Sequence, residues 1–418
     1  MDKFSIEGPC RIKGRVKISG SKNSSLPILA STLLFDQPVT IRNLPKVKDI
    51  DTMLSLLKSL GSKIILSKDK RIAKIHNKNK IKTFASYSLV KTMRGSILVL
   101  GPLVAKYFQS KISLPGGCLI GARPINYHLD ALKKLGMDYI LKDGYILAKS
   151  KGKLKGATIK FPKISVGATE NSIIAACLAK GITILKNCAV EPEIKDLTNF
   201  LNLAGANITW KGRTCKIVGV TTLNKTEYSV MSDRIEAGTF CVAATITGGN
   251  LDILNFDANI IKTELNLLKK FGAKIRIYKK KLSIKGPKNI KPVTNIKTGE
   301  YPGVATDMQS QLMVLMCKAN GKSYITENIF ENRFMHVPEL KRMGADIEIK
   351  DKTAIIRGPT KLAGAEVMAT DLRASVSLVL AGLVAEKRTI INRIYHLDRG
   401  YESLERKLKS CKAEIKRF

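Results

Sequence analysis

A glycine-rich segment in the first third of the chain carries two side chains suited to chemistry. Residues 114–124 read LPGGCLIGARP, so a thiol (Cys118) and a guanidinium (Arg123) lie five positions apart among three glycines. A thiol with an ordinary pKa of about 8.5 can act as a proton donor or a nucleophile when neighbouring charges tune it. The segment therefore predicts a reactive loop that closes over a substrate as a lid.

The other seven cysteines carry no comparable signal. They form no C-x-x-C pair, and no histidine lies at the spacing of a zinc ligand. We therefore expect reduced thiols and no metal site. Cys177, Cys241 and Cys317 fall inside apolar stretches and are expected to be inert core residues.

Polar and charged residues recur at the start of six apolar segments. The six starts read SKN (21–23), KTMR (91–94), SVGA (165–168), SDRIE (232–236), TDMQ (306–309) and TDLR (370–373). Ser, Thr and Asp are typical helix N-caps, and helix N-termini attract anions. If these ends converge, Lys22, Arg94, Arg234 and Arg373 would complete an anion-binding cleft. The alternative is that each Asp and Arg merely pair with each other across an interface.

These six segments belong to one repeated pattern. Each apolar helix is followed by a strand, an amphipathic helix and a marker glycine that closes that helix. The markers lie at positions 61, 136, 205, 272, 344 and 412, where Lys412 replaces glycine, and their separations are 75, 69, 67, 72 and 68 residues. We expect the first helix of each unit to be buried on nearly all sides and the second to cover the outside.

The repeat predicts an α/β fold in two globular halves of three units each, with sheets wrapped around the inner helices and a boundary near 228–232. Unit two departs from the spacing, because Pro115 to Gly136 is 21 positions whereas Pro45 to Gly61 is 16. The five extra residues fall in the Cys118 loop.

Composition limits the remaining classes of function. At 418 residues and 44% hydrophobic side chains, without an apolar run of about 18 residues, we expect a soluble cytoplasmic protein with a large core. The net charge of +38 would suggest a nucleic-acid partner, but the lysines are dispersed and aromatic residues are only 6%. The dispersion favours compositional drift, although a positive field would still help to gather anionic substrates.

The chain resembles the UDP-N-acetylglucosamine enolpyruvyl transferase family almost from end to end. The resemblance is carried by SGSKN (19–23), LPGGC (114–118) with GARP (121–124), ENRFMH (331–336), ATDLRAS (369–375) and DRGYE (398–402). It implies an inside-out α/β barrel whose two domains, 22–231 and 1–21 plus 232–418, each contain three βαβαββ-type units. It also implies that UDP-N-acetylglucosamine binds first and that the Cys118 loop then folds over phosphoenolpyruvate.

The activity implied by this resemblance is enolpyruvyl transfer from phosphoenolpyruvate to the 3-hydroxyl of the sugar nucleotide, with release of phosphate, at the first committed step of peptidoglycan precursor synthesis. Cys118 would be the general acid at C3, would form a covalent phospholactoyl adduct and would be alkylated by fosfomycin. Asp307 would be the base. No cofactor or metal is implied, and the partners would be these two small molecules, not nucleic acid or a membrane.

The resemblance also assigns contacts to individual residues. The residues implied to contact phosphoenolpyruvate are Lys22, Asn23, Arg123, Arg373 and Arg399. Of these, Lys22, Asn23 and Arg399 would also be catalytic. Those implied for UDP-N-acetylglucosamine are Arg94, Arg123, Pro124, Ile125, Asn126, Tyr127, Lys163, Ile164, Ser165, Val166, Asp307 and Ile329.

The sequence alone leaves three rival functions open. The sister family that transfers enolpyruvyl to shikimate 3-phosphate would share the fold, but the presence of the Cys118 loop disfavours membership of that sister family. A basic nucleic-acid-binding protein is favoured by charge alone. An enzyme fold that has lost activity is disfavoured by the intact Lys22, Cys118, Asp307, Arg373 and Arg399. The chain departs from the family pattern at Ala305 and Lys412, neither of which is expected to touch the chemistry.

Overall fold

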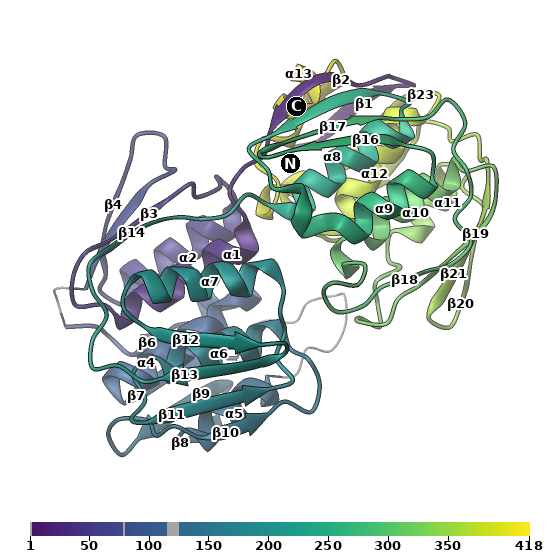
Figure 1. Cartoon of the computed structure of the whole chain (residues 1–418). Coiled ribbons are helices and arrows are strands. Elements are labelled where there is room, and N and C mark those ends of the chain that lie inside the picture. The colour runs from purple at the N-terminus through teal and green to yellow at the C-terminus, as the bar shows by residue number, and fades with distance from the viewer. Residues whose placement is uncertain (1, 78–79, 115–124) are drawn as a thin grey trace. The chain divides into compact units, whose positions relative to one another are not determined.

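The computed structural model describes residues 2–77, 80–114 and 125–418, which form two compact units (Figure 1). Unit 1 contains the described residues up to Ser19 together with Ser232–Phe418, and unit 2 contains the described residues from Gly20 to Met231. Each unit has its own apolar core. In the described part of the chain, no helix is both long and apolar enough to span a membrane.

The described residues form six four-stranded sheets of one topology, in which a parallel pair of strands is followed by two antiparallel neighbours. The sheets of unit 2 are β14 (Thr226–Ser229), β3 (Val39–Arg42), β5 (Ala73–His76), β4 (Lys63–Leu66); β6 (Phe84–Ala85), β7 (Gln109–Ser113), β9 (Tyr145–Ser150), β8 (Met137–Lys142); and β10 (Thr158–Lys160), β11 (Ile182–Lys186), β13 (Thr214–Val218), β12 (Asn207–Lys211). The sheets of unit 1 are β2 (Lys13–Lys17), β15 (Asn250–Leu254), β17 (Lys281–Lys285), β16 (Lys274–Tyr278); β18 (Ile296–Lys297), β19 (Gly321–Thr326), β21 (Thr353–Gly358), β20 (Ile347–Lys350); and β22 (Glu366–Met368), β23 (Lys387–Asn392), β1 (Phe4–Gly8), β24 (Glu414–Arg417).

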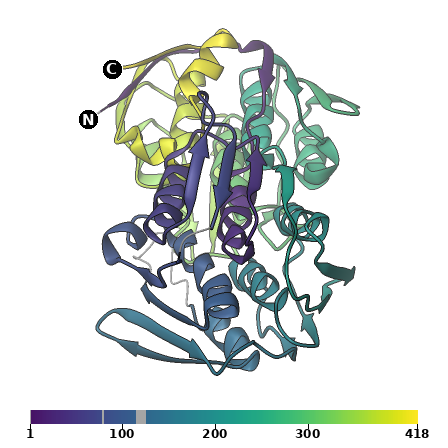
Figure 2. The ribbon, with the colours of Figure 1, turned by 90° about the vertical axis from the view of Figure 1, so that its left-hand side faces the viewer.

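Strands from opposite ends of the chain complete these sheets. In unit 2, β14 pairs in parallel with β3, so Thr226 lies opposite Val39. In unit 1, β1 lies between β23 and β24, and β2 pairs in parallel with β15. The two termini consequently lie side by side (Figure 2), where the amide of Lys3 donates to the carbonyl of Phe418 at 2.8 Å.

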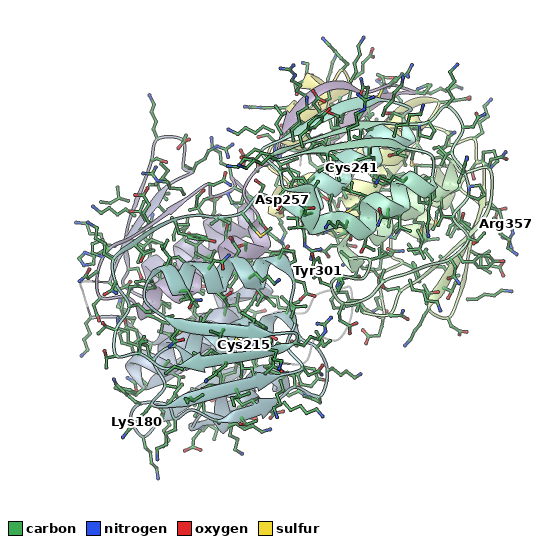
Figure 3. The ribbon with its side chains drawn as sticks, in the orientation of Figure 1. Lys180, Cys215, Cys241, Asp257, Tyr301 and Arg357 are labelled. Atoms are coloured by element: carbon green, nitrogen blue, oxygen red, sulfur yellow. The ribbon has the colours of Figure 1, made fainter. Side chains whose placement is uncertain are left out.

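The first helix of each repeat is buried, as the apolar sequence predicts. These inner helices are α1 (Lys22–Ser31), α4 (Leu100–Tyr107) and α6 (Val166–Ala176) in unit 2, and α8 (Arg234–Ile246), α10 (Gln309–Cys317) and α12 (Leu372–Val384) in unit 1. Every residue of α8 and α10 is buried, and α8, α10 and α12 all contact one another. Cys241 lies on α8 inside unit 1 (Figure 3), and burial raises its pKa, so it is an inert core thiol.

The second helix of each repeat has one buried side. These outer helices are α2 (Lys48–Ser59), α5 (Asn126–Lys134), α7 (Pro192–Leu203), α9 (Lys262–Lys270), α11 (Val337–Arg342) and α13 (Leu404–Ser410). On α9, for example, Leu265 and Leu268 are buried whereas Lys269 and Lys270 are exposed. An apolar stripe of this kind packs against the interior and leaves the charged side to solvent.

Two inner segments begin differently from the prediction. Arg94–Val99 (η2) and Thr306–Met308 (η4) are 3-10 turns that precede α4 and α10, and neither Thr92 nor Thr306 caps a helix. The Thr92 hydroxyl instead donates to the Leu89 carbonyl at 3.1 Å, which is the local side-chain bonding that competes with capping. Four predicted caps, Ser21, Ser165, Asp233 and Asp371, do accept backbone N–H groups.

Candidate active site

In unit 1, Asp307 lies between two buried arginines. It belongs to η4, and its Oδ1 accepts from Arg333 Nη2 at 2.6 Å while its Oδ2 accepts from Arg373 Nη2 at 2.7 Å. The arginine side chains are 3% and 6% exposed, whereas that of Asp307 is 27% exposed. Burial opposes the charge of Arg373, but Asp307 more than compensates and raises the pKa of this guanidinium. The pair therefore presents two fixed cations around one carboxylate.

The carboxylate of Glu327 organises the backbone beside this cluster. Glu327 is 2% exposed; its Oε2 accepts from the Thr306 hydroxyl at 2.9 Å and its Oε1 accepts from the amide of Ile329 at 2.8 Å. Arg333 Nη2 also approaches the Thr306 carbonyl at 3.4 Å. The loop that carries Ile329 is thus tied to the turn that carries Asp307.

Arg399, the fourth predicted residue of unit 1, ends the 3-10 segment η5 (Ile394–Arg399) and is half-buried. Partial burial, and after it the charge of Arg399, lower the pKa of His396. Both effects favour the neutral form of the imidazole.

In unit 2, the predicted Lys22 is paired with Asp49. Lys22 begins α1, and its Nζ donates to Oδ2 of Asp49, in the first turn of α2, at 3.2 Å. The two side chains are 13% and 6% exposed. Ser21 caps α1 by accepting from the amide of Ser24 at 3.3 Å, and Asn23 lies half-buried in the first turn. An ammonium group at a capped helix N-terminus is a suitable anion ligand.

A second cluster of unit 2 joins Arg94 to a buried histidine. Burial, and after it the charge of Arg94, lower the pKa of His128 to about 3. The amide oxygen of Asn171 accepts from the Gly101 N–H at 2.8 Å, so its Nδ2 faces the Ile97 carbonyl and His128 Nδ1, at 3.1 and 3.2 Å. His128 is therefore a neutral imidazole that accepts at Nδ1 and carries its proton on Nε2.

The remaining described residues predicted to contact the sugar nucleotide gather at the starts of two contacting helices, α5 and α6. Helix α5 begins at Asn126, with Ile125 at its N-cap position and Tyr127 in its first turn. Lys163 and Ile164 directly precede Ser165, the N-cap residue of α6. Ser165 caps α6 by accepting from the amide of Ala168 at 3.3 Å, and Val166 is 39% exposed.

Cys118, Arg123 and Pro124 lie outside the described residues, as does most of the predicted lid. The expected convergence of all six helix starts likewise stays a prediction.

Sequence reasoning missed the partners of the predicted residues. Arg333 lies in the ENRFMH segment, which carried the resemblance, so its type and place were a usable signal. No sequence signal pointed to Asp49, Glu327 or Asn171, because the tertiary fold brings each of them to its partner from a distant part of the sequence.

Comparisons with known proteins find relatives along the whole chain. A family model described as EPSP synthase (3-phosphoshikimate 1-carboxyvinyltransferase) matches residues 6–408. A UDP-N-acetylglucosamine 1-carboxyvinyltransferase of Pelagibacter ubique is 59% identical over the whole of both chains, and one of Geobacter metallireducens is 52% identical over 100% of this chain and 99% of its own.

Solved structures confirm the predicted fold class. The enolpyruvyl transferase NikO from Streptomyces tendae matches with a TM-score of 0.90 at 24% identity, covering 100% of this chain and 98% of its own. An EPSP synthase from Acinetobacter baumannii matches with a TM-score of 0.78 at 20% identity over the whole of both chains. From the full-length identity to its relatives, the chain belongs to the EPSP synthase family and, within it, to the UDP-N-acetylglucosamine 1-carboxyvinyltransferases.

Proposed function

We propose that this protein transfers the enolpyruvyl group of phosphoenolpyruvate to the 3-hydroxyl of UDP-N-acetylglucosamine and releases phosphate. The proposal is supported by 59% identity over the full chain to a relative of that name. The structural observation that carries it is the buried pair Arg333 and Arg373 around Asp307. Guanidinium groups bind carboxylate and phosphate oxygens in a planar, two-pronged fashion, as a substrate with both groups requires.

In this proposal Lys22, Arg123, Arg373 and Arg399 hold the phosphate and carboxylate of phosphoenolpyruvate, and Asn23 touches the reacting hydroxyl. The hydroxyl oxygen attacks C2 as Cys118 protonates C3. Phosphate then leaves, and loss of a proton from C3 restores the double bond. Cationic groups fixed before the reaction stabilise the charge on the departing phosphate. The Cys118 thiol can also add across the double bond itself, with its sulfur bonding to C2 and its proton passing to C3, which gives the phospholactoyl adduct.

Asp307 is the proposed base for the sugar hydroxyl, and its hydrogen bonds to Arg333 and Arg373 affect its availability as a base. Both carboxylate oxygens accept hydrogen bonds from guanidinium groups, which stabilise the charged form. A substrate anion that competes for Arg373 would free one oxygen of Asp307. The base would then become available only when phosphoenolpyruvate is present.

The sugar nucleotide would be held by Arg94, by the starts of α5 and α6 that include Tyr127 and Lys163, and by Ile329 as a packing contact. We further propose that residues 22–231 and residues 1–21 plus 232–418 act as the two domains of the enzyme, that it works in the cytoplasm, and that it needs no metal. Its product would be the first committed precursor of peptidoglycan.

The test is phosphate release from phosphoenolpyruvate with either UDP-N-acetylglucosamine or shikimate 3-phosphate, for wild type and Cys118→Ser. We expect release with the sugar nucleotide alone, reduced by the substitution. Release with shikimate 3-phosphate would assign the sister activity, and no release with either acceptor would remove the enzymatic proposal. Intact-protein mass after incubation with fosfomycin and UDP-N-acetylglucosamine should increase in wild type and stay constant in Cys118→Ser.

A further inference from the structure

Arg373 has a second buried partner besides Asp307. Its Nη1 donates to the hydroxyl of Tyr401 at 3.2 Å, and its Cζ lies 5.6 Å from the centre of the Tyr401 ring. Tyr401 is 2% exposed, so the contact is shielded from water. Asp307 and Tyr401 thus engage different nitrogens of one guanidinium group.

The hydrogen bonds beyond Tyr401 have a defined direction. The Thr239 hydroxyl donates to the Ile235 carbonyl of α8 at 2.8 Å, so its proton is already used. The Tyr401 oxygen lies 2.9 Å from Thr239 Oγ1, and burial raises the pKa of Tyr401, so the phenol keeps its proton and donates to Thr239. The Tyr401 oxygen is then left to accept from Arg373. The hydrogen bonds therefore form a chain in which Arg373 donates to Tyr401, Tyr401 donates to Thr239, and Thr239 donates to a helix carbonyl. Bonds aligned in this way polarise and strengthen one another.

Gln311 ties the Asp307 turn into the same network. Its Nε2 lies 2.9 Å from the Asp307 carbonyl and 3.2 Å from Thr239 Oγ1. Gln311 is on α10, Thr239 on α8 and Arg373 on α12, so the network joins all three inner helices of unit 1. The guanidinium group of Arg373 is therefore held by hydrogen bonds to the buried inner helices of unit 1.

From this geometry we propose that Tyr401, itself oriented by Thr239, is a positioning residue that holds Arg373 in place for the anionic substrate. The inference rests on the proposed function, in which Arg373 contacts phosphoenolpyruvate. An arginine side chain has several rotatable bonds, and free rotation would weaken binding. When the substrate anion replaces Asp307, the bond to Tyr401 is the one that remains.

The test is steady-state kinetics of phosphate release for Tyr401→Phe, with each substrate varied in turn. Loss of a buried hydrogen bond to a charged group predicts a rise in KM for phosphoenolpyruvate of roughly 10- to 100-fold. The KM for UDP-N-acetylglucosamine should change by less than about threefold, since Tyr401 is expected to act through Arg373 alone. Tyr107→Phe is the matched control, because it removes a tyrosine hydroxyl that donates to the Leu33 carbonyl at 3.2 Å in unit 2.

A pair of Thr239 variants keeps the test decisive if Tyr401→Phe folds poorly. Thr239→Ser retains the acceptor for Tyr401 and should behave like wild type, whereas Thr239→Val removes it and should raise KM for phosphoenolpyruvate in the same direction as Tyr401→Phe. A residue with only a structural role would lower the melting temperature and the active fraction but leave this KM unchanged, and that result would overturn the inference. Absence of release by wild type would instead refute the proposed function.

Discussion

At the residue scale, the described part of the site contains cations that are paired with buried or half-buried acidic and polar groups. Lys22 has Asp49, Arg373 has Asp307 and Tyr401, and Arg333 shares Asp307. Buried charges need such partners, because an isolated charge away from water is costly. Residue types and spacing predicted Lys22 and Arg373 as anion ligands, and the family resemblance added Asp307. Neither could predict that Lys22 pairs with Asp49 or Arg373 with Tyr401, because pairing between distant segments is decided by the fold, although Tyr401 lies in DRGYE (398–402), which carried the resemblance.

Arg333→Met tests the pairing around Asp307. The change removes one of the two guanidinium groups that hold this carboxylate, and we expect the rate of phosphate release to fall by roughly 100-fold or more. The matched control is Arg357→Met, which removes an exposed arginine of β21 that pairs with Asp346 and Glu348 (Figure 3). Equal rates for the two variants would show that Arg333 has no part in the reaction.

The buried His128 predicts a pH dependence of stability. Its pKa in the folded protein is about 3, below the ordinary 6.5, so the unfolded chain binds a proton that the folded chain excludes. Its contribution to the free energy of unfolding therefore falls as the pH drops from about 6.5 towards 3, by up to about 1.4 kcal/mol per pH unit. Urea unfolding at pH 7 and pH 5 should show a smaller loss in His128→Gln than in wild type.

Other buried groups make this comparison between variants necessary. Burial raises the pKa of Glu170 and Asp196, and a raised carboxylate pKa stabilises the folded state as the pH falls. Those contributions are common to wild type and His128→Gln, so the difference between the two proteins isolates the histidine. Equal losses in both proteins would refute the assignment.

At the element scale, the marker residue was the most informative feature of the sequence. Gly61, Gly136, Gly205, Gly272 and Gly344 have φ between +93° and +107°, and Lys412 has φ +70°. All six lie in the left-handed region, which glycine adopts without steric penalty. The marker therefore predicted six helix ends correctly, whereas the 3-10 starts at Arg94 and Thr306 could not be read from the cap residues.

Gly136→Ala and Lys412→Gly test the marker in opposite directions. A Cβ on Gly136 would meet no atom within 4 Å, so the cost is backbone strain alone, and we expect stability to fall by about 1 kcal/mol. Lys412→Gly relieves that strain and should raise stability by about 0.5 kcal/mol, because the extra freedom of glycine in the unfolded chain offsets part of the gain. Thermal unfolding measures both. A loss of stability in Lys412→Gly would contradict the explanation.

At the scale of the whole molecule, the net charge of +38 is the strongest departure from an ordinary enzyme. Excess positive charge destabilises a compact state by self-repulsion, and added salt screens it. The α/β class and the sixfold repeat could be predicted because both leave periodic patterns in the sequence. Which strand completes which sheet could not, since β1, β2 and β14 are short and join partners far along the chain.

Salt should therefore raise the melting temperature. We expect an increase of several degrees when NaCl is raised from about 20 to about 300 mM, together with a higher KM for phosphoenolpyruvate as attraction of the anion is screened. A neutral osmolyte at equal osmolality is the control. A melting temperature that falls over this range would show that attractive ion pairs outweigh the repulsion.

The pairing of strands from the two ends of the chain has a consequence for how the protein is made. All the strands and helices of unit 2 lie between Lys22 and Ser229, so its sheets can be completed while the rest of the chain is still on the ribosome. Unit 1 needs β1 and β2, which are translated first, and β24, which is translated last. Strand β2 has no partner until β15 has been made, β1 has none until β23 has been made, and the last strand to leave the ribosome completes its sheet against the first one made.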